Sequence, residues 1–288
     1  MKLFILTVMN GLTLAALYFL VASGFTLVFG LMRNVNLAHG SLYLLGGYVG
    51  FDVAEWTGSW YLGLAAGFLG MAVVGAILQV AIFRRMQGQE LRQTLVTIGL
   101  SIVMADLMLA TWSGNTYQFS PPDWLTGPVQ LMAHPVVKFP IIRLALFFSA
   151  IVIGVGLWLL LNKTRIGMMI RAGVDDRGML SASGVNVQRV FAITFALGAG
   201  LAGFAGVVGG TALSIAPGDD TRYLLASLVV VIVGGMGSVT GAAVGAILIG
   251  LAEQLGLVYS PTYGVVYTFL IMVAVLAFRP QGIMGRAA

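Results

Sequence analysis

Hydrophobic residues along this chain fall into long stretches with few or no charged side chains, separated by short polar links. Most stretches reach the roughly 20 residues that a helix needs to cross a bilayer. The second and seventh are shorter and end in glycine pairs, Gly46-Gly47 and Gly234-Gly235, which favours broken or re-entrant helices protected by their neighbours. We therefore expect eight or nine membrane-spanning helices. The stretches are 3–32, 35–51, 60–83, 93–112, 144–162, 190–213, 223–236, 239–258 and 262–278.

Composition agrees with an all-α integral membrane protein, a single transmembrane domain over residues 1–288. Of the 288 residues, 59% are hydrophobic and 9% are charged, against about 25% charged in ordinary soluble domains. The uncharged run from Leu3 to Met32 exceeds the core of a signal peptide and is expected to be retained as a helix. The chain has no cysteine, which excludes disulfides, thiolate metal sites and cysteine nucleophiles.

The net charge of +5 comes from basic residues in the links, where they indicate orientation rather than nucleic-acid binding. Two basic links and the C-terminal tail are expected in the cytoplasm, and the proline-rich link 113–142, with Trp124, outside. Nine spans would place the N-terminus outside, and eight would place it inside. The basic residues concerned are Arg84, Arg85, Arg92, Lys163, Arg165, Arg171, Arg177, Arg189, Arg279 and Arg286.

Two regions share one order of elements: a long apolar helix, a polar break and a short segment ending in glycines. They are 12–50, with a break at 33–36, and 191–245, with a break at 217–222. By the expected orientation one break faces in and the other out, which is typical of inverted repeats in transporters. The half-repeats would cover about 3–112 and 190–278, although composition alone also produces weak similarity between apolar segments.

Small residues recur every four positions in two ladders, which favours close helix packing more than a pore lining. The ladders are Ala202, Gly206, Gly210 and Gly237, Gly241, Gly245.

Three ionisable residues interrupt the apolar stretches: His39, Asp106 and Glu253. An unpaired charge at mid-membrane costs at least about 2.5–3.5 kcal/mol, so each is a candidate for a polar translocation path, or else for interhelical hydrogen bonding. Asn36 to Gly40 reads as a helix start in which Asn36 caps the first turn. Such a helix end at membrane depth would favour a carboxylate group of a substrate, although a plain cap explains the pattern too.

Enzyme chemistry has little support in the sequence. A pair of Ser238 and His39, as in an intramembrane hydrolase, lacks any spacing that indicates contact. No Gly-x-x-x-x-Gly-Lys-[Ser/Thr] loop occurs, so ATP binding by that route is excluded. We expect no catalytic residue, metal or cofactor on this chain, and any ATP hydrolysis would belong to another subunit.

The basic link 162–189 has the character of a docking element. Its segment RAGVDDRGMLSASG, residues 171–184, mixes charges with apolar residues and ends in a glycine suited to a helix C-cap. We expect one short helix there, although a plain solvated loop is the alternative. The candidate coupling residues are Arg171, Ala172, Asp175, Asp176, Leu180, Ala182, Ser183 and Gly184.

Several segments together resemble the LivH-type permease subunits of branched-chain amino acid ABC importers, over essentially the whole chain. They are GFTLVFGLMRNVNLAHGSLYLLGGYV (24–49), TIGLSIV (97–103), TRIGMMIRAGVDDRGMLSASGVNVQRVFAITFALGAGLAGFAGVV (164–208), VVVIVGGMGSVTGAAVGAILIG (229–250) and FRPQGIMG (278–285).

The resemblance implies a bacterial inner-membrane permease that forms half of a translocation path. It implies three kinds of partner: a homologous second permease, two cytoplasmic ATPase subunits that use the ATP, and an external solute-binding protein. It also implies that residues 171–184 contact an ATPase. Leu37 and Ser41 stand where relatives often have Phe and Glu, which leaves open branched-chain or other amino acids, amides or urea. The alternative function is an autonomous ion-coupled carrier or channel, with Asp106 and Glu253 binding the ion.

Overall fold

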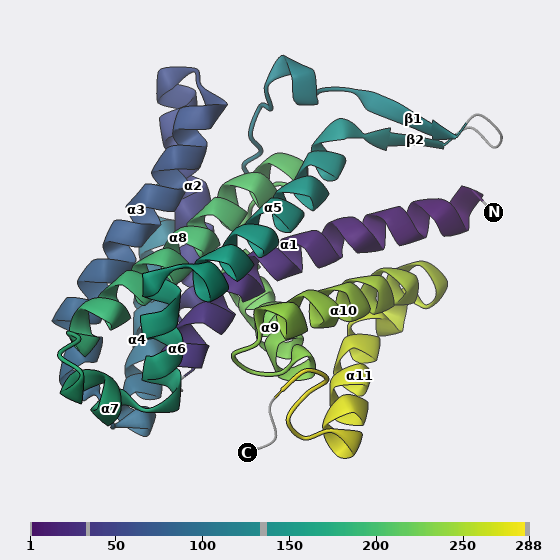
Figure 1. Ribbon diagram of the computed structural model, residues 1–288. Coiled ribbons are helices and arrows are strands. Elements are labelled where there is room, and N and C mark those ends of the chain that lie inside the picture. The colour runs from purple at the N-terminus through teal and green to yellow at the C-terminus, as the bar shows by residue number, and fades with distance from the viewer. Residues whose placement is uncertain (1, 33–34, 133–136, 286–288) are drawn as a thin grey trace.

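The computed structural model describes residues 2–32, 35–132 and 137–285, and it is a helical bundle (Figure 1). The α-helices are α1 (Lys2–Met32), α2 (His39–Thr57), α3 (Trp60–Ala81), α4 (Glu90–Trp112), α5 (Ile141–Lys163), α6 (Arg165–Asp175), α7 (Arg177–Ala182), α8 (Val187–Ala212), α9 (Asp219–Gly234), α10 (Val239–Tyr259) and α11 (Gly264–Phe278). Short 3-10 turns are η1 (Phe83–Met86), η2 (Asp123–Leu125) and η3 (Pro261–Tyr263).

Six helices of the described part are long and apolar enough to cross a membrane: α1, α3, α4, α5, α8 and α10. The expected eight or nine also counted three shorter helices, α2, α9 and α11. Helices α1 and α8 form the core, with 89% and 72% of their apolar windows buried, whereas only 17% is buried in α4 and in α5. The outer helices therefore present apolar faces that suit lipid or a partner helix. The protein is an all-α polytopic membrane protein.

The link between α4 and α5 contains the only strands in the described ranges, which the sequence interpretation missed. Strands β1 (Pro128–Met132) and β2 (Val137–Pro140) form an antiparallel hairpin with Val129 opposite Phe139. Phe139 is buried, at 2% exposure, and anchors the hairpin to the bundle. The expected loop is thus partly ordered as sheet. Pro135 lies outside the described residues.

The bundle has two ends: the β1–β2 hairpin lies at one of them, and helices α6 and α7 lie at the other (Figure 1). At the hairpin end, Arg143 donates to Asn10 at 2.6 Å. At the other end, Gln87 of the first basic link donates to Gln188 at 3.0 Å. The beginning of α1 therefore lies opposite the basic links, as the nine-span alternative expects. That the basic end faces the cytoplasm stays a prediction, and Arg286 lies outside the described residues.

The C-terminal tail closes the end of α9. The backbone N–H groups of Ile283 and Met284 donate to the carbonyls of Val233 and Gly234, each at 2.9 Å. These carbonyls belong to the last turn of α9 and have no partner within the helix. Gly235 follows with φ +110°, a conformation that glycine adopts easily. The helix therefore ends at the second glycine pair, as expected.

The first glycine pair has a different role from the one expected. Gly46 and Gly47 do not end α2, which continues to Thr57. Instead they face α8, where any side chain at Gly46 would overlap the backbone of Gly203. Close backbone approach between helices requires small residues at these positions. The repeat of a long helix, a break and a short helix recurs as α1–α2 and α8–α9, but the inverted repeat stays a prediction.

The two small-residue ladders differ in the structure. Gly206 packs against the backbone of α2 at Tyr43, and Gly210 packs against the ring of Phe119. Gly241 and Gly245 both face α9. Gly237 does not belong on the same helix face, because it precedes α10 in a turn with φ +81°. The ladder was extended one position too far because Ser238 caps α10 and ends the periodicity.

Candidate functional site

Helices α2 and α9 begin next to each other inside the bundle. Gly40, the second residue of α2, packs against the backbone carbonyl of Asp220, the second residue of α9. A Cβ at Gly40 would also stand 2.8 Å from the Cβ of Leu224. Only glycine permits this approach. The expected helix start at residues 36–40 is therefore present, and it meets the start of another helix.

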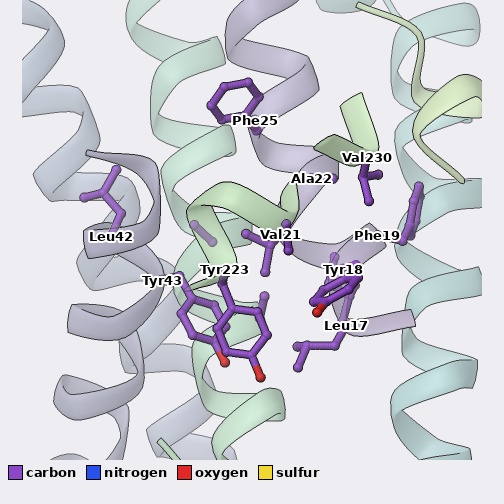
Figure 2. Packing of buried hydrophobic residues seen from close by; sticks show 14 of the residues in the cluster. Leu17, Tyr18, Phe19, Val21, Ala22, Phe25, Leu42, Tyr43, Tyr223 and Val230 are labelled. Atoms are coloured by element: carbon purple, nitrogen blue, oxygen red, sulfur yellow. The ribbon is translucent and has the colours of Figure 1, made fainter. Parts of the chain in front are cut away.

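Three buried tyrosines surround this meeting point (Figure 2). Tyr43 and Tyr223 are each the fifth residue of their helix, and their ring centroids are 4.6 Å apart. Tyr18 of α1 meets the edge of Tyr223 at 6.1 Å. All three are at most 3% exposed. The sequence interpretation missed them because tyrosines in apolar stretches look like ordinary core residues, although their equal spacing from two helix starts was a usable signal.

Glu253 of α10 is held in this cluster by two side chains. Tyr18 donates its hydroxyl to Oε2 at 2.7 Å, and Nη2 of Arg222 stands 3.8 Å from Oε1. The Glu253 side chain is 9% exposed and that of Arg222 is 54% exposed. The guanidinium of Arg222 also lies over the Tyr223 ring, 5.6 Å from its centroid. A carboxylate at this depth therefore has both a hydroxyl donor and a cation.

His39 is fully buried and joins α2 to α1. Its Nε2 donates to the carbonyl of Val21 at 3.0 Å, and its ring meets Phe25 edge-on at 5.5 Å. Its Nδ1 has no hydrogen-bond partner among the described residues. These contacts describe an interhelical hydrogen bond, one of the two roles expected for it. A role for His39 in a substrate path stays a prediction.

Asn36 lies just before α2, but it does not cap the helix as expected. The N-cap residue is Ala38, which makes no side-chain capping bond. Asn36 Oδ1 instead accepts from the Ala38 N–H at 3.1 Å, two residues on, in a local turn. The Asn36 side chain is buried, and its Nδ2 has no partner among the described residues. The amide orders the connection into α2 rather than its first turn.

Asp106 lies apart from the other ionisable candidates. It is exposed on the outer face of α4, whereas His39 and Glu253 are buried. Two residues near His39 in the sequence contact α4: the backbone N–H of Leu37 donates to the Thr97 hydroxyl at 3.2 Å, and the Ser41 hydroxyl donates to the Ser101 carbonyl at 3.5 Å. The structure therefore places His39 and Glu253 around the meeting of α1, α2 and α9, and Asp106 outside it.

The serine and histidine of the hydrolase alternative do not form a catalytic pair. Ser238 Oγ accepts from the Gly241 N–H at 3.0 Å as the N-cap of α10. His39 is bonded to Val21 of α1. Each residue therefore has a structural partner of its own, and nothing couples the hydroxyl to the imidazole.

The basic link forms two helices rather than one across residues 171–184. Helix α6 ends at Asp175, and Asp176 caps α7 by accepting from the N–H groups of Gly178 and Met179 at 2.8 and 3.0 Å. Gly184 ends the segment with φ +82°. Arg171 donates to Asn162 at 2.9 Å. The side chains of Asp175 and Arg177 lie outside those that the structure describes.

The apolar surface of this link differs from the expected one. Leu180 is 6% exposed and packs inside the chain, so it cannot anchor a partner. Met179, its neighbour, is 74% exposed, which the sequence interpretation overlooked. Ala172, Ala182 and Ser183 are exposed, as docking requires. The large apolar side chain that α7 leaves accessible is therefore Met179, and docking of a partner on this link stays a prediction.

Comparisons with known proteins agree with the sequence resemblance. Residues 7–276 match the family described as branched-chain amino acid transport system, permease component. The chain is 30% identical over 300 residues to the LivH high-affinity branched-chain amino acid permease protein of Salmonella typhimurium, covering 98% of this chain and 96% of that one. It is 29% identical over 293 residues to BraD of Pseudomonas aeruginosa, with coverage of 96% and 94%.

A more distant match is the ribose import permease protein RbsC of Escherichia coli, 25% identical over 244 residues, with coverage of 82% and 73%. No solved structure matches. The family match and the 30% identity to LivH both extend over nearly the whole chain, and both indicate the same kind of protein. The chain belongs to the family of permease components of branched-chain amino acid transport systems.

Proposed function

We propose that this chain is a permease subunit of an ATP-driven importer in a bacterial inner membrane and forms half of a path for amino acids, in particular branched-chain ones. The main support is the full-length similarity to permeases named for this transport. Its partners would be a homologous but different permease, two cytoplasmic ATPase subunits that bind the ATP, and an external solute-binding protein.

Two features of the structure support this function. The helix starts of α2 and α9 meet beside the pair of Glu253 and Arg222, so polar groups are available inside an otherwise apolar bundle. The link of α6 and α7 offers the exposed Met179 to a partner. The ion-coupled alternative gains little support, because Glu253 is already engaged by Tyr18 and Arg222 and Asp106 lies apart.

The test begins with the proteins that co-purify with this chain from its native membrane. The purified assembly is reconstituted into vesicles, and uptake of labelled leucine is measured with and without ATP on the ATPase side. We expect co-purified ATPase subunits and uptake that requires ATP and the external binding protein. Uptake by the chain alone, driven by an ion gradient, would show the carrier alternative instead.

A further inference from the structure

The ion pair between Arg222 and Glu253 links the buried cluster to the surface of the chain. Glu253 is nearly inaccessible, at 9% side-chain exposure, whereas Arg222 is 54% exposed. Arg222 lies in the first turn of α9 and Glu253 lies in the second half of α10. The pair therefore stands where an outside molecule can reach the cation first and the carboxylate after it.

The two contacts of Glu253 differ in length. The Tyr18 hydroxyl donates at 2.7 Å, a short charge-assisted hydrogen bond. The nearest nitrogen of Arg222 stands 3.8 Å away, beyond hydrogen-bonding distance. Arg222 can therefore turn away while Tyr18 still orients the carboxylate. The nearby Asp219 does not compete for Arg222 by a direct bond, since its Oδ2 accepts from the Ala216 N–H at 2.8 Å.

We propose that Arg222 and Glu253 form a recognition site for the charged head of an α-amino acid, an inference that rests on the proposed function. Arg222 binds the carboxylate through its planar fork of donors. Glu253, oriented by Tyr18, accepts from the ammonium. A zwitterion carries one charge of each sign. When it binds, the pair between Arg222 and Glu253 is replaced by two pairs, Arg222 with the carboxylate and Glu253 with the ammonium, so neither protein charge is left unpaired.

This exchange defines which solutes the site accepts. Separating Arg222 from Glu253 without replacement would leave a buried carboxylate without its cation, which is costly at membrane depth. Urea, an amide or a sugar carries no charges to compensate the two separated groups. The site therefore favours free α-amino acids over the neutral solutes that this scaffold otherwise leaves open.

The test uses the complete transporter in lipid nanodiscs without its external binding protein, so that the permease itself selects. Binding is measured by saturation-transfer NMR for three probes: leucine, leucinamide, which lacks the carboxylate, and 2-hydroxyisocaproate, which lacks the ammonium. We expect the wild type to bind leucine at least about tenfold more tightly than either analogue, as loss of one charge-assisted hydrogen bond implies.

Two variants separate the roles of the charges. Arg222→Gln is expected to lose about tenfold in leucine affinity and to bind leucinamide unchanged, whereas Glu253→Gln loses leucine affinity and retains that for 2-hydroxyisocaproate. Glu253→Gln keeps the size of the side chain and an acceptor for Tyr18. The exposed residues Lys138 and Glu55 give matched charge controls as Lys138→Gln and Glu55→Gln, which should change no affinity.

Retained ATPase subunits show that each variant is assembled. The proposed site is overturned by any of three results: the variants lose affinity equally for all three probes, the variants lose no affinity, or the wild type does not bind leucine. ATP-driven leucine uptake by the full system is measured in parallel. Wild-type uptake combined with unchanged preferences in both variants rejects the site and leaves the importer function intact, whereas absence of wild-type uptake rejects both.

Discussion

Met179→Ala tests whether helix α7 couples the permease to a cytoplasmic partner. Met179 is 74% exposed although it is a large apolar residue in a short helix. Full burial of a methionine side chain stabilises by about 1.5–3 kcal/mol. If a partner covers the exposed three quarters, the contact contributes about 1–2 kcal/mol. Its removal should weaken retention of the partner roughly 5- to 30-fold.

The assay measures the ATPase subunits retained by the purified chain at several dilutions, together with ATP-dependent leucine uptake. Ala182→Glu, on the same exposed surface, should uncouple hydrolysis from uptake or release the ATPase. Met236→Ala removes another methionine, 54% exposed and outside the link, and is the matched control. Unchanged retention and uptake in both Met179→Ala and Ala182→Glu would refute α7 as the coupling element.

Three further predictions concern packing and topology. Gly40→Val should destabilise the chain by about 1–3 kcal/mol or more, because a side chain there overlaps the α9 backbone; thermal unfolding in detergent measures this, and Gly99→Ala, inside α4 with open space around it, should cause no destabilisation. His39→Ala should cost about 0.5–1.5 kcal/mol by removing the buried hydrogen bond between α2 and the Val21 carbonyl of α1, and an unchanged melting temperature would contradict this. Because the chain lacks cysteine, Trp124→Cys should react with an impermeant reagent outside intact cells and Lys163→Cys should not; the reverse pattern would invert the topology.

The long helices could be predicted from sequence because the length of an uncharged stretch reports directly on a membrane span. The hairpin could not be predicted, because prolines are typical of loops. Here Pro128 begins β1 and Pro140 ends β2, and the two residues lie opposite each other. The boundary of α9 was also placed too late. Arg222 was assigned to the polar break before the helix, but it lies within the first turn.

The composition of the candidate site was partly predictable, and its pairing was not. Glu253 stood out as a charge in an apolar stretch, and so did Asp106 by the same criterion, yet one is buried and the other is exposed. Which face of a helix a residue occupies depends on its neighbours in three dimensions. The partners Tyr18 and Arg222 come from two other helices, and sequence spacing carries no information about such contacts.

The hydrogen bonds between the C-terminal tail and α9 connect the tail to one end of a helix whose other end carries the ion pair. The tail holds the last turn at Val233 and Gly234, and the first turn carries Arg222. A helix of 16 residues is about 24 Å long and behaves as a stiff rod. If residues 283–284 were displaced and α9 moved as one body, Arg222 at the other end of the helix would move relative to Glu253. The tail lies at the end of the bundle that carries the basic links, so contacts made there could change the distance between Arg222 and Glu253.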